Sequence, residues 1–380
     1  MPLTVVIGLT IAAAVPLVVL YVIHRLDLYG MGAFRTVLLC FAWGGAAFAL
    51  AFGLNNATLH FGLVSYDNFK RFSAPIIEEI LKSLILIYLV RRPNFTYFVD
   101  GAIYGFASGV GFAIFENYFY IFSNPGNSLG LAAGRVLSTN LMHATGSALV
   151  GIALGLARFK MGGARLLWML GGYALAMPLH VGFNNLVTRD VGSLLLVYAA
   201  GVGFGGTGLI AAAMRRGLKE EKGWIEEKLG AADRVTSGEA AVVQHLQKVA
   251  DLLAPIKQKF GAAKAGEVEK FLTVQARLGI LRKTLDKLAN DPKMAQAVSA
   301  QMEDLRRQME ASRRAVGAYC MLYVRNIFPP DSSPLWGRLE SVIQERAAVR
   351  PAAGGPNLWA ALQDRAAQAG AGAPEEPSTP

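Results

Sequence analysis

The chain has 380 residues, of which 53% are hydrophobic and only 17% are charged. This composition excludes an ordinary soluble protein and is typical of a protein that crosses the lipid bilayer several times. The net charge of +10 is attributed to loop Lys and Arg on one side of the membrane, so no nucleic-acid partner is predicted.

The charged residues are unevenly distributed along the chain. Residues 1–216 contain 14 Lys and Arg and 7 Asp and Glu, so the remaining 23 of 37 and 20 of 27 lie in 217–380. We therefore predict a transmembrane domain at 1–216 and a cytosolic helical domain at 217–328. The Ala-, Gly- and Pro-rich residues 329–380 are predicted to be a largely disordered tail.

Seven apolar runs approach the length of about 20 residues that a helix needs to cross the hydrocarbon core. The predicted fold is therefore all-α, a polytopic membrane helical bundle of about seven spans. The third run is short and carries charges. The runs lie at 3–23, 36–56, 74–90, 99–121, 135–157, 166–188 and 192–214.

Basic residues are more frequent in the connections that follow odd-numbered spans. Arg91 and Arg92 follow the third span, and Arg215 and Arg216 follow the seventh. Loops rich in Lys and Arg stay in the cytoplasm. We therefore predict a multi-pass cell-membrane protein with its N-terminus outside and its C-terminus in the cytoplasm.

Three charged residues interrupt the third span, APIIEEILKSLILIYLV: Glu78, Glu79 and Lys82. Each charge at membrane depth costs about 2.5 kcal/mol or more on insertion scales, and such residues usually face a bundle interior. Spacings of three and four allow one glutamate to pair with the lysine along the helix. A neutralised pair tolerated in a bundle is one explanation. The pair leaves the second glutamate unexplained, which favours a second explanation, that a glutamate is a general base.

The next three spans each contain a further polar residue. Glu116 lies in FAIFENYF, His143 in STNLMHATG and His180 in AMPLHVGFNN. Asn140 precedes His143 by about one turn, and Asn184 follows His180 by four residues on the same helix face. In the predicted topology all of them fall in the outer part of the bilayer, which indicates one common site.

A stripe of glycines predicts how the fourth span faces its neighbours. Gly101, Gly105 and Gly109 are spaced by four residues, and Glu116 lies seven residues further on roughly the same face. Small residues at this spacing let helices approach closely. We therefore expect Glu116 to point into the bundle.

Several hydrolytic mechanisms lack their sequence motifs. The chain contains no HExxH, no GxSxG and no pair of membrane-embedded aspartates. Water activated by a carboxylate with histidine assistance remains, as does a metal held by Glu and His. A membrane transporter, or a non-proteolytic scaffold that signals through its cytosolic helices, also remains open.

Four strings of the chain resemble the PrsW family of intramembrane proteases, distant relatives of the CAAX prenyl endopeptidases. They are PIIEEILKS, DGAIYGFASGVGFAIFENYFY, HATGSALVGIALGLARFK and LHVGFNN. The resemblance covers roughly residues 70–190. The matching positions are the double glutamate Glu78 and Glu79, its basic partner Lys82, the FxxxE glutamate Glu116, the histidines His143 and His180, and the last asparagine Asn184.

The resemblance implies an endopeptidase whose substrate is a membrane protein. The predicted depth of the site, in the outer part of the bilayer, implies that a single-pass substrate is cut near the outer membrane boundary. Glu78 or Glu79 would take a proton from water. His143 would help to orient or protonate the reacting groups, with Asn140 in support. His180 and Asn184 would hold the developing oxyanion. No cofactor is predicted. The alternative is a zinc ion, whose ligands would be Glu79, Glu116, His143 and His180.

The region after residue 217 is predicted to be helical and coiled-coil-like. Apolar residues recur there at alternating steps of three and four, a pattern that favours a packed helix seam. This pattern allows either a helical hairpin or a coil that joins two copies, so a homo-oligomer through these helices is one expectation. The seam residues are Phe271, Val274, Leu278, Leu281, Leu285 and Leu288.

Overall fold

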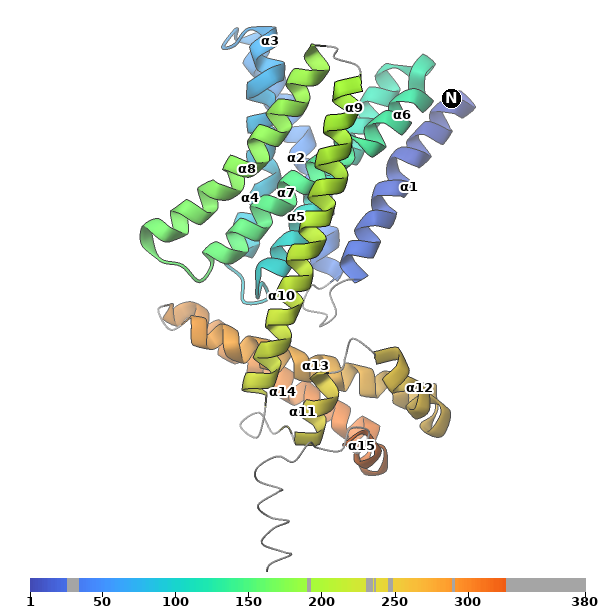
Figure 1. Ribbon diagram of the computed structural model, residues 1–380, viewed down its shortest axis with the longest axis vertical. Coiled ribbons are helices and arrows are strands. Elements are labelled where there is room, and N and C mark those ends of the chain that lie inside the picture. The colour runs from blue at the N-terminus through green and yellow to red at the C-terminus, as the bar shows by residue number, and fades with distance from the viewer. Residues whose placement is uncertain are drawn as a thin grey trace, which may run out of the picture. The chain divides into compact units, whose positions relative to one another are not determined.

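The computed structural model describes residues 1–25, 34–189, 193–229, 235, 237–244, 249–288 and 291–325. All regular elements among these residues are helices, and they contain no strand (Figure 1). The all-α prediction is therefore confirmed. The predicted tail, 329–380, lies outside the described residues.

Six helical stretches of the described chain are long and apolar enough to cross a membrane. The predicted third span is α4, which has only 16 residues and carries the charged side chains, so it falls short of this length. A membrane-embedded bundle is confirmed, with α4 as an additional short helix. The six stretches are Leu3–Val22, Phe34–His60, Phe98–Ser123, Pro125–Ala157, Gly162–Thr188 and Val197–Lys228.

The bundle consists of seven longer helices and several short elements that precede three of them. The long helices are α1 (Leu3–Arg25), α2 (Phe34–His60), α4 (Ala74–Leu89), α5 (Phe98–Ser123), α7 (Thr139–Ala157), α8 (Gly162–Thr188) and α10 (Gly206–Lys228). The short elements are α3 (Tyr66–Asn68) and the π-helix η1 (Phe69–Ser73) before α4, η2 (Pro125–Asn127) and α6 (Ser128–Leu137) before α7, and α9 (Ser193–Ala200) and the π-helix η3 (Gly201–Gly205) before α10.

Two predicted spans are therefore divided. The run 135–157 is interrupted at Ser138, between α6 and α7, and the run 192–214 contains α9, η3 and the start of α10. Each divided run still counts as one apolar stretch by its length and mean hydropathy, so hydropathy could not reveal these breaks. The division matters for function because α6 becomes a separate helix at the start of α7.

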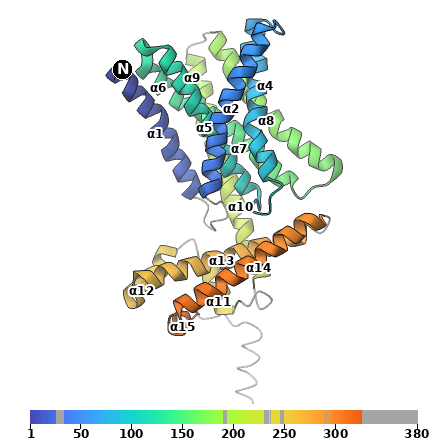
Figure 2. The same ribbon diagram turned by 180° about the vertical axis from the view of Figure 1, so that it is seen from behind.

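Helix α5 lies at the centre of the bundle and packs closely against α7 (Figure 2). A Cβ atom at Gly101 would lie 2.0 Å from the carbonyl oxygen of Gly151, and one at Gly105 would lie 2.2 Å from that of Ser147. No side chain fits at these positions, so the two backbones touch. The predicted glycine stripe thus faces α7.

Helix α10 continues without a break through residue 217, where we predict a domain boundary. The helices beyond it are α11 (Ser237–Gln244), α12 (Val249–Phe260), α13 (Ala262–Lys287), α14 (Pro292–Val316) and α15 (Ala318–Arg325). Helices α13 and α14 form a hairpin, and the predicted seam packs within the chain against α14, α12 and α10. A coiled coil between two copies is therefore not supported by this packing.

A lysine surrounded by aromatic rings connects the end of α13 to the start of α5. Lys287 Nζ lies 3.7 Å from the ring centre of Trp224, 5.0 Å from that of Tyr97 and 5.2 Å from that of Phe159. Ammonium groups are attracted to the faces of such rings. Burial lowers the pKa of Lys287 to about 8. The helices after residue 217 therefore contact the helix that carries Glu116.

Candidate active site

Four helices bring the predicted polar residues to one level of the bundle. Glu78 and Glu79 lie early in α4, Glu116 late in α5, His143 early in α7 and His180 late in α8. Consecutive spans run in opposite directions, so the start of one helix meets the end of the next (Figure 1). The structure thus brings together residues that are up to about a hundred positions apart.

A buried ion pair forms the base of the site. Lys82 Nζ lies 2.5 Å from Glu79 Oε1, and both side chains are fully buried. His180 Nδ1 lies 2.9 Å from the same carboxylate oxygen. The predicted pairing of one glutamate with the lysine is confirmed, and the glutamate is Glu79. A buried pair needs such additional hydrogen bonds to offset its lost hydration.

The ring of His143 is held at both nitrogens. Its Nδ1 lies 2.9 Å from Lys82 Nζ, and its Nε2 lies 3.0 Å from Glu116 Oε2. An ammonium can only donate hydrogen bonds, so Nδ1 must accept. The proton of neutral His143 is then on Nε2 and points at Glu116.

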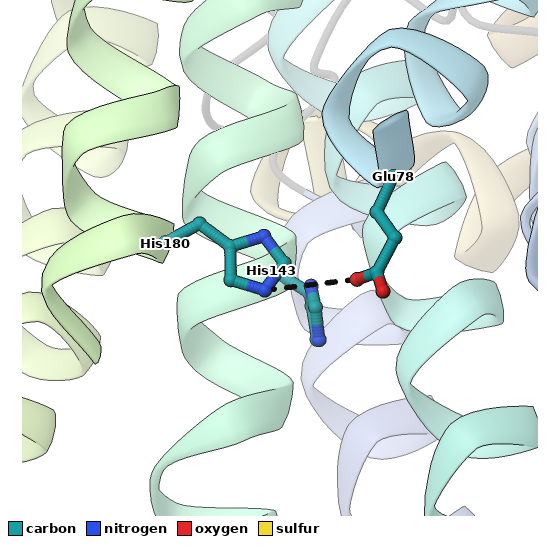
Figure 3. Close-up of side chains that lie close together, drawn as sticks. All are labelled: Glu78, His143 and His180. Atoms are coloured by element: carbon teal, nitrogen blue, oxygen red, sulfur yellow. Dashed lines mark ion pairs between the residues drawn. The ribbon is translucent and has the colours of Figure 1, made fainter. Parts of the chain in front are cut away.

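Glu78 faces a cavity of about 790 Å³ that Glu116, His143 and His180 also line. Glu78 Oε2 lies 3.6 Å from His180 Nε2, and Figure 3 shows the side chains of Glu78, His143 and His180 converging. Asn55 Nδ2 lies 3.4 Å from Glu78 Oε1. The two adjacent glutamates therefore differ in position: Glu78 faces the cavity, whereas Glu79 is buried with Lys82.

Sequence reasoning missed Arg135, which lies on α6 and forms an ion pair with Glu116 at 2.7 Å. Its Nε donates to Asn117 Oδ1 at 2.6 Å, and Asn117 Nδ2 donates to Asn140 Oδ1 at 2.5 Å. Asn140 is thus connected to the site through Asn117 and Arg135. The available signal was a lone basic residue at the start of the predicted span 135–157.

Asn184 also lines the cavity, although its amide is engaged elsewhere. Its Nδ2 donates to the main-chain oxygen of Lys70 at 2.9 Å. This bond connects α8 to the π-helix η1 before α4. The oxyanion role of Asn184 stays a prediction.

Glu78, His143 and His180 could hold a metal, because one ligand atom from each lies within 4.8 Å of the others. This set differs from the predicted ligands, since Glu79 is paired with Lys82 and Glu116 with Arg135. His180 would suit a metal at Nε2, because Glu79 holds its other nitrogen, Nδ1, by a hydrogen bond.

His143 does not fit a metal as it is arranged. A ligating imidazole nitrogen needs a free lone pair, but Nδ1 of His143 accepts from Lys82 and Nε2 carries the proton directed at Glu116. Coordination would require the Lys82 contact to break or the lysine to lose its charge. The three-residue set is therefore geometrically close to a metal site but chemically incomplete.

Comparisons with known proteins support a relationship over the membrane part. Residues 32–212 match the sequence profile of the PrsW family, described as "PrsW family intramembrane metalloprotease". The chain is 32% identical over 117 residues to Protease PrsW of Bacillus subtilis (strain 168). The aligned segment is 30% of this chain and 52% of that protein. The chain is also 33% identical over 117 residues to Protease PrsW of Clostridioides difficile (strain 630). This aligned segment is 30% of this chain and 44% of that protein.

The matches are partial. The chain spans about half the length of the curated relatives that it matches. No solved structure matches the chain.

Proposed function

We propose that this protein is an intramembrane endopeptidase, because residues 32–212 match the sequence profile of the PrsW family. Its substrate would be a single-pass membrane protein. One observation carries the proposal: a carboxylate, Glu78, and an imidazole, His180, converge on a cavity among apolar helices. A peptide bond entering this cavity would meet a base and hydrogen-bond donors at one place.

In the proposed mechanism Glu78 is the general base. Glu78 removes a proton from a water molecule in the cavity, and the resulting hydroxide attacks the carbonyl carbon of the peptide bond. Glu78 then returns the proton to the leaving amine nitrogen as the C–N bond breaks. Glu79 orients His180 through the 2.9 Å hydrogen bond. The Nε2–H of His143, which donates to Glu116 in the absence of substrate, would be shared with the reacting carbonyl when a substrate binds.

Comparative membrane proteomics tests the proposed function. Membranes from cells with wild-type protein are compared with membranes from cells with the Glu78→Gln/Glu79→Gln variant. We expect one single-pass protein to accumulate uncut in the variant. If no membrane protein changes length between the two, the proposed function is wrong.

We propose catalysis without a metal, and the arrangement of His143 supports this proposal. We expect activity to survive strong chelation, because Lys82 and Glu116 occupy both nitrogens of His143. Elemental analysis of the purified active protein should find zinc well below one equivalent. Stoichiometric zinc, with activity lost on chelation and restored by added metal, would contradict this prediction.

The side of cleavage follows from the proposed orientation, with the C-terminus in the cytoplasm. Helix α10 leads toward that side, and the site lies at the opposite end of the bundle, where α1 begins (Figure 1). We expect the cut near the outer membrane boundary, so that the external domain of the substrate is released. Mass spectrometry of the new terminus measures the position.

Reporter fusions provide the control for this prediction. A reporter enzyme that works only in the cytoplasm should be active when it is joined after residue 325. A reporter enzyme that works only outside the cytoplasm should be inactive there. A cut on the cytoplasmic side of the substrate would contradict the proposed direction, whatever the reporter shows.

A further inference from the structure

Part of the cavity wall consists of phenylalanine rings from two helices, which we term the aromatic wall: Phe48, Phe52, Phe112 and Phe119. These rings form a continuous path from the site. The ring centre of Phe112 lies 5.1 Å from that of His143, and Phe48 lies 5.6 Å from Phe112. Phe52 and Phe119 lie 5.1 Å apart, and Phe48 lies 6.3 Å from each of them.

The packing of α2 on α5 explains why these rings border a cavity. A Cβ atom at Gly44 would lie 2.1 Å from the oxygen of Ser108, and one at Gly111 would lie 2.0 Å from the oxygen of Phe41. The two backbones therefore touch at this level. About one to two turns further along, both helices carry large rings instead of glycines, and the ring centres of Phe48 and Phe119 lie 6.3 Å apart.

The outer rings of the aromatic wall are incompletely covered. Phe52 is 44% exposed and Phe119 is 41% exposed, although both contact other rings. Large aromatic side chains that line a cavity offer ring faces and edges against which an apolar side chain can pack closely. The wall therefore has the character of a binding surface.

The position of the wall relative to the base is set by α2. Asn55 contacts Glu78, and Phe52 precedes Asn55 by three residues, which is about 4.5 Å of helix rise. Neighbouring residues of an extended peptide are about 3.3–3.6 Å apart. A peptide whose carbonyl lies at Glu78 would therefore place a side chain on the wall within two residues of that bond.

We propose that the aromatic wall is a specificity subsite, which binds one large apolar side chain of the substrate within two residues of the cleaved bond. The subsite rests on the proposed function. The cavity volume of about 790 Å³ is in the range of pockets that enclose small organic ligands and is far larger than one water molecule needs. The occupant is a Phe, Leu or Met side chain of a membrane-spanning segment.

Peptide cleavage by the full-length protein in detergent micelles tests the subsite. The probe is a mixture of synthetic apolar peptides that carry either Phe, Leu or Met, or only Ala, at the positions flanking each bond. We expect Phe52→Ala/Phe119→Ala to lower kcat/KM for bonds flanked by large apolar residues about 10-fold or more. Bonds flanked only by Ala should be cut at the wild-type rate.

Two control variants lie on the same helices outside the cavity lining. Phe122 on α5 is 56% exposed and Leu54 on α2 is 49% exposed. Phe122→Ala and Leu54→Ala should keep the wild-type preference. A second subsite variant, Phe52→Trp, narrows the space and should shift cleavage toward smaller side chains, so the proposal is testable even if the double variant does not fold.

A binding experiment tests the subsite independently of catalysis. The same peptides are added to the Glu78→Gln protein, and bound peptides are identified by mass spectrometry. Selective retention of peptides with large apolar residues without any wild-type cleavage would support the subsite and contradict the proposed function. Cleavage or binding with the same preference in wild type and in both subsite variants would overturn the subsite and leave the proposed function intact.

Discussion

Replacing Glu78 by glutamine should lower the rate of substrate cleavage about 1,000-fold or more, within the range attributed to general-base catalysis. The amide has nearly the shape of the carboxylate but cannot remove a proton from water. Glu78 faces the cavity, where it contacts Asn55 and His180, so the fold should be retained. Cleavage of the substrate found by proteomics, followed by immunoblot in membranes, measures the effect.

Two controls accompany this variant. Glu226→Gln changes a half-exposed glutamate on α10, far along the chain from the site, and should leave cleavage unchanged. Thermal unfolding of Glu78→Gln in detergent should match that of the wild type. Near-normal cleavage by well-expressed Glu78→Gln would show that another group is the base.

Replacing Lys82 by methionine should destabilise the protein by about 3–5 kcal/mol, because it leaves a buried carboxylate without its partner. The carboxylate is that of Glu79, which lies 2.5 Å from Lys82 Nζ in the wild type. His143 also loses the donor at Nδ1. We expect a lower thermal unfolding midpoint in detergent and loss of cleavage.

A double variant separates the two effects of this substitution. Lys82→Met/Glu79→Gln removes both charges, so much of the stability should return. Cleavage should stay absent, because nothing then fixes the proton of His143 on Nε2. If the single Lys82→Met variant unfolds at the wild-type midpoint, the buried pair does not have the structural role assigned here.

The sequence was sufficient to predict the helical class and the residues that gather at the site, since charges inside apolar runs are conspicuous. It could not separate the roles of Glu78 and Glu79. Both lie at nearly the same depth on one helix, but Glu79 is paired with Lys82 whereas Glu78 faces the cavity. The role of each glutamate depends on tertiary contacts.

Arg135 and the break at Ser138 were also beyond sequence reasoning. Residues 125–157 are apolar enough on average to form one membrane-crossing stretch, although Ser138, Thr139 and Asn140 are polar, so mean hydropathy does not separate α6 from α7. An arginine at the start of a span is usually an interfacial anchor. Its ion pair with Glu116 arises because α6 lies beside the end of α5.

The lysine enclosed by aromatic rings determines how the protein can be shortened for study. Trp224 lies 4.5 Å from the ring of Tyr97, and Lys287 contacts both of them together with Phe159. A fragment ending at residue 216 would remove Trp224 and Lys287 and leave the rings at the start of α5 uncovered. Exposed apolar surface of this kind promotes aggregation. Purification of the membrane helices should therefore retain the chain through residue 325.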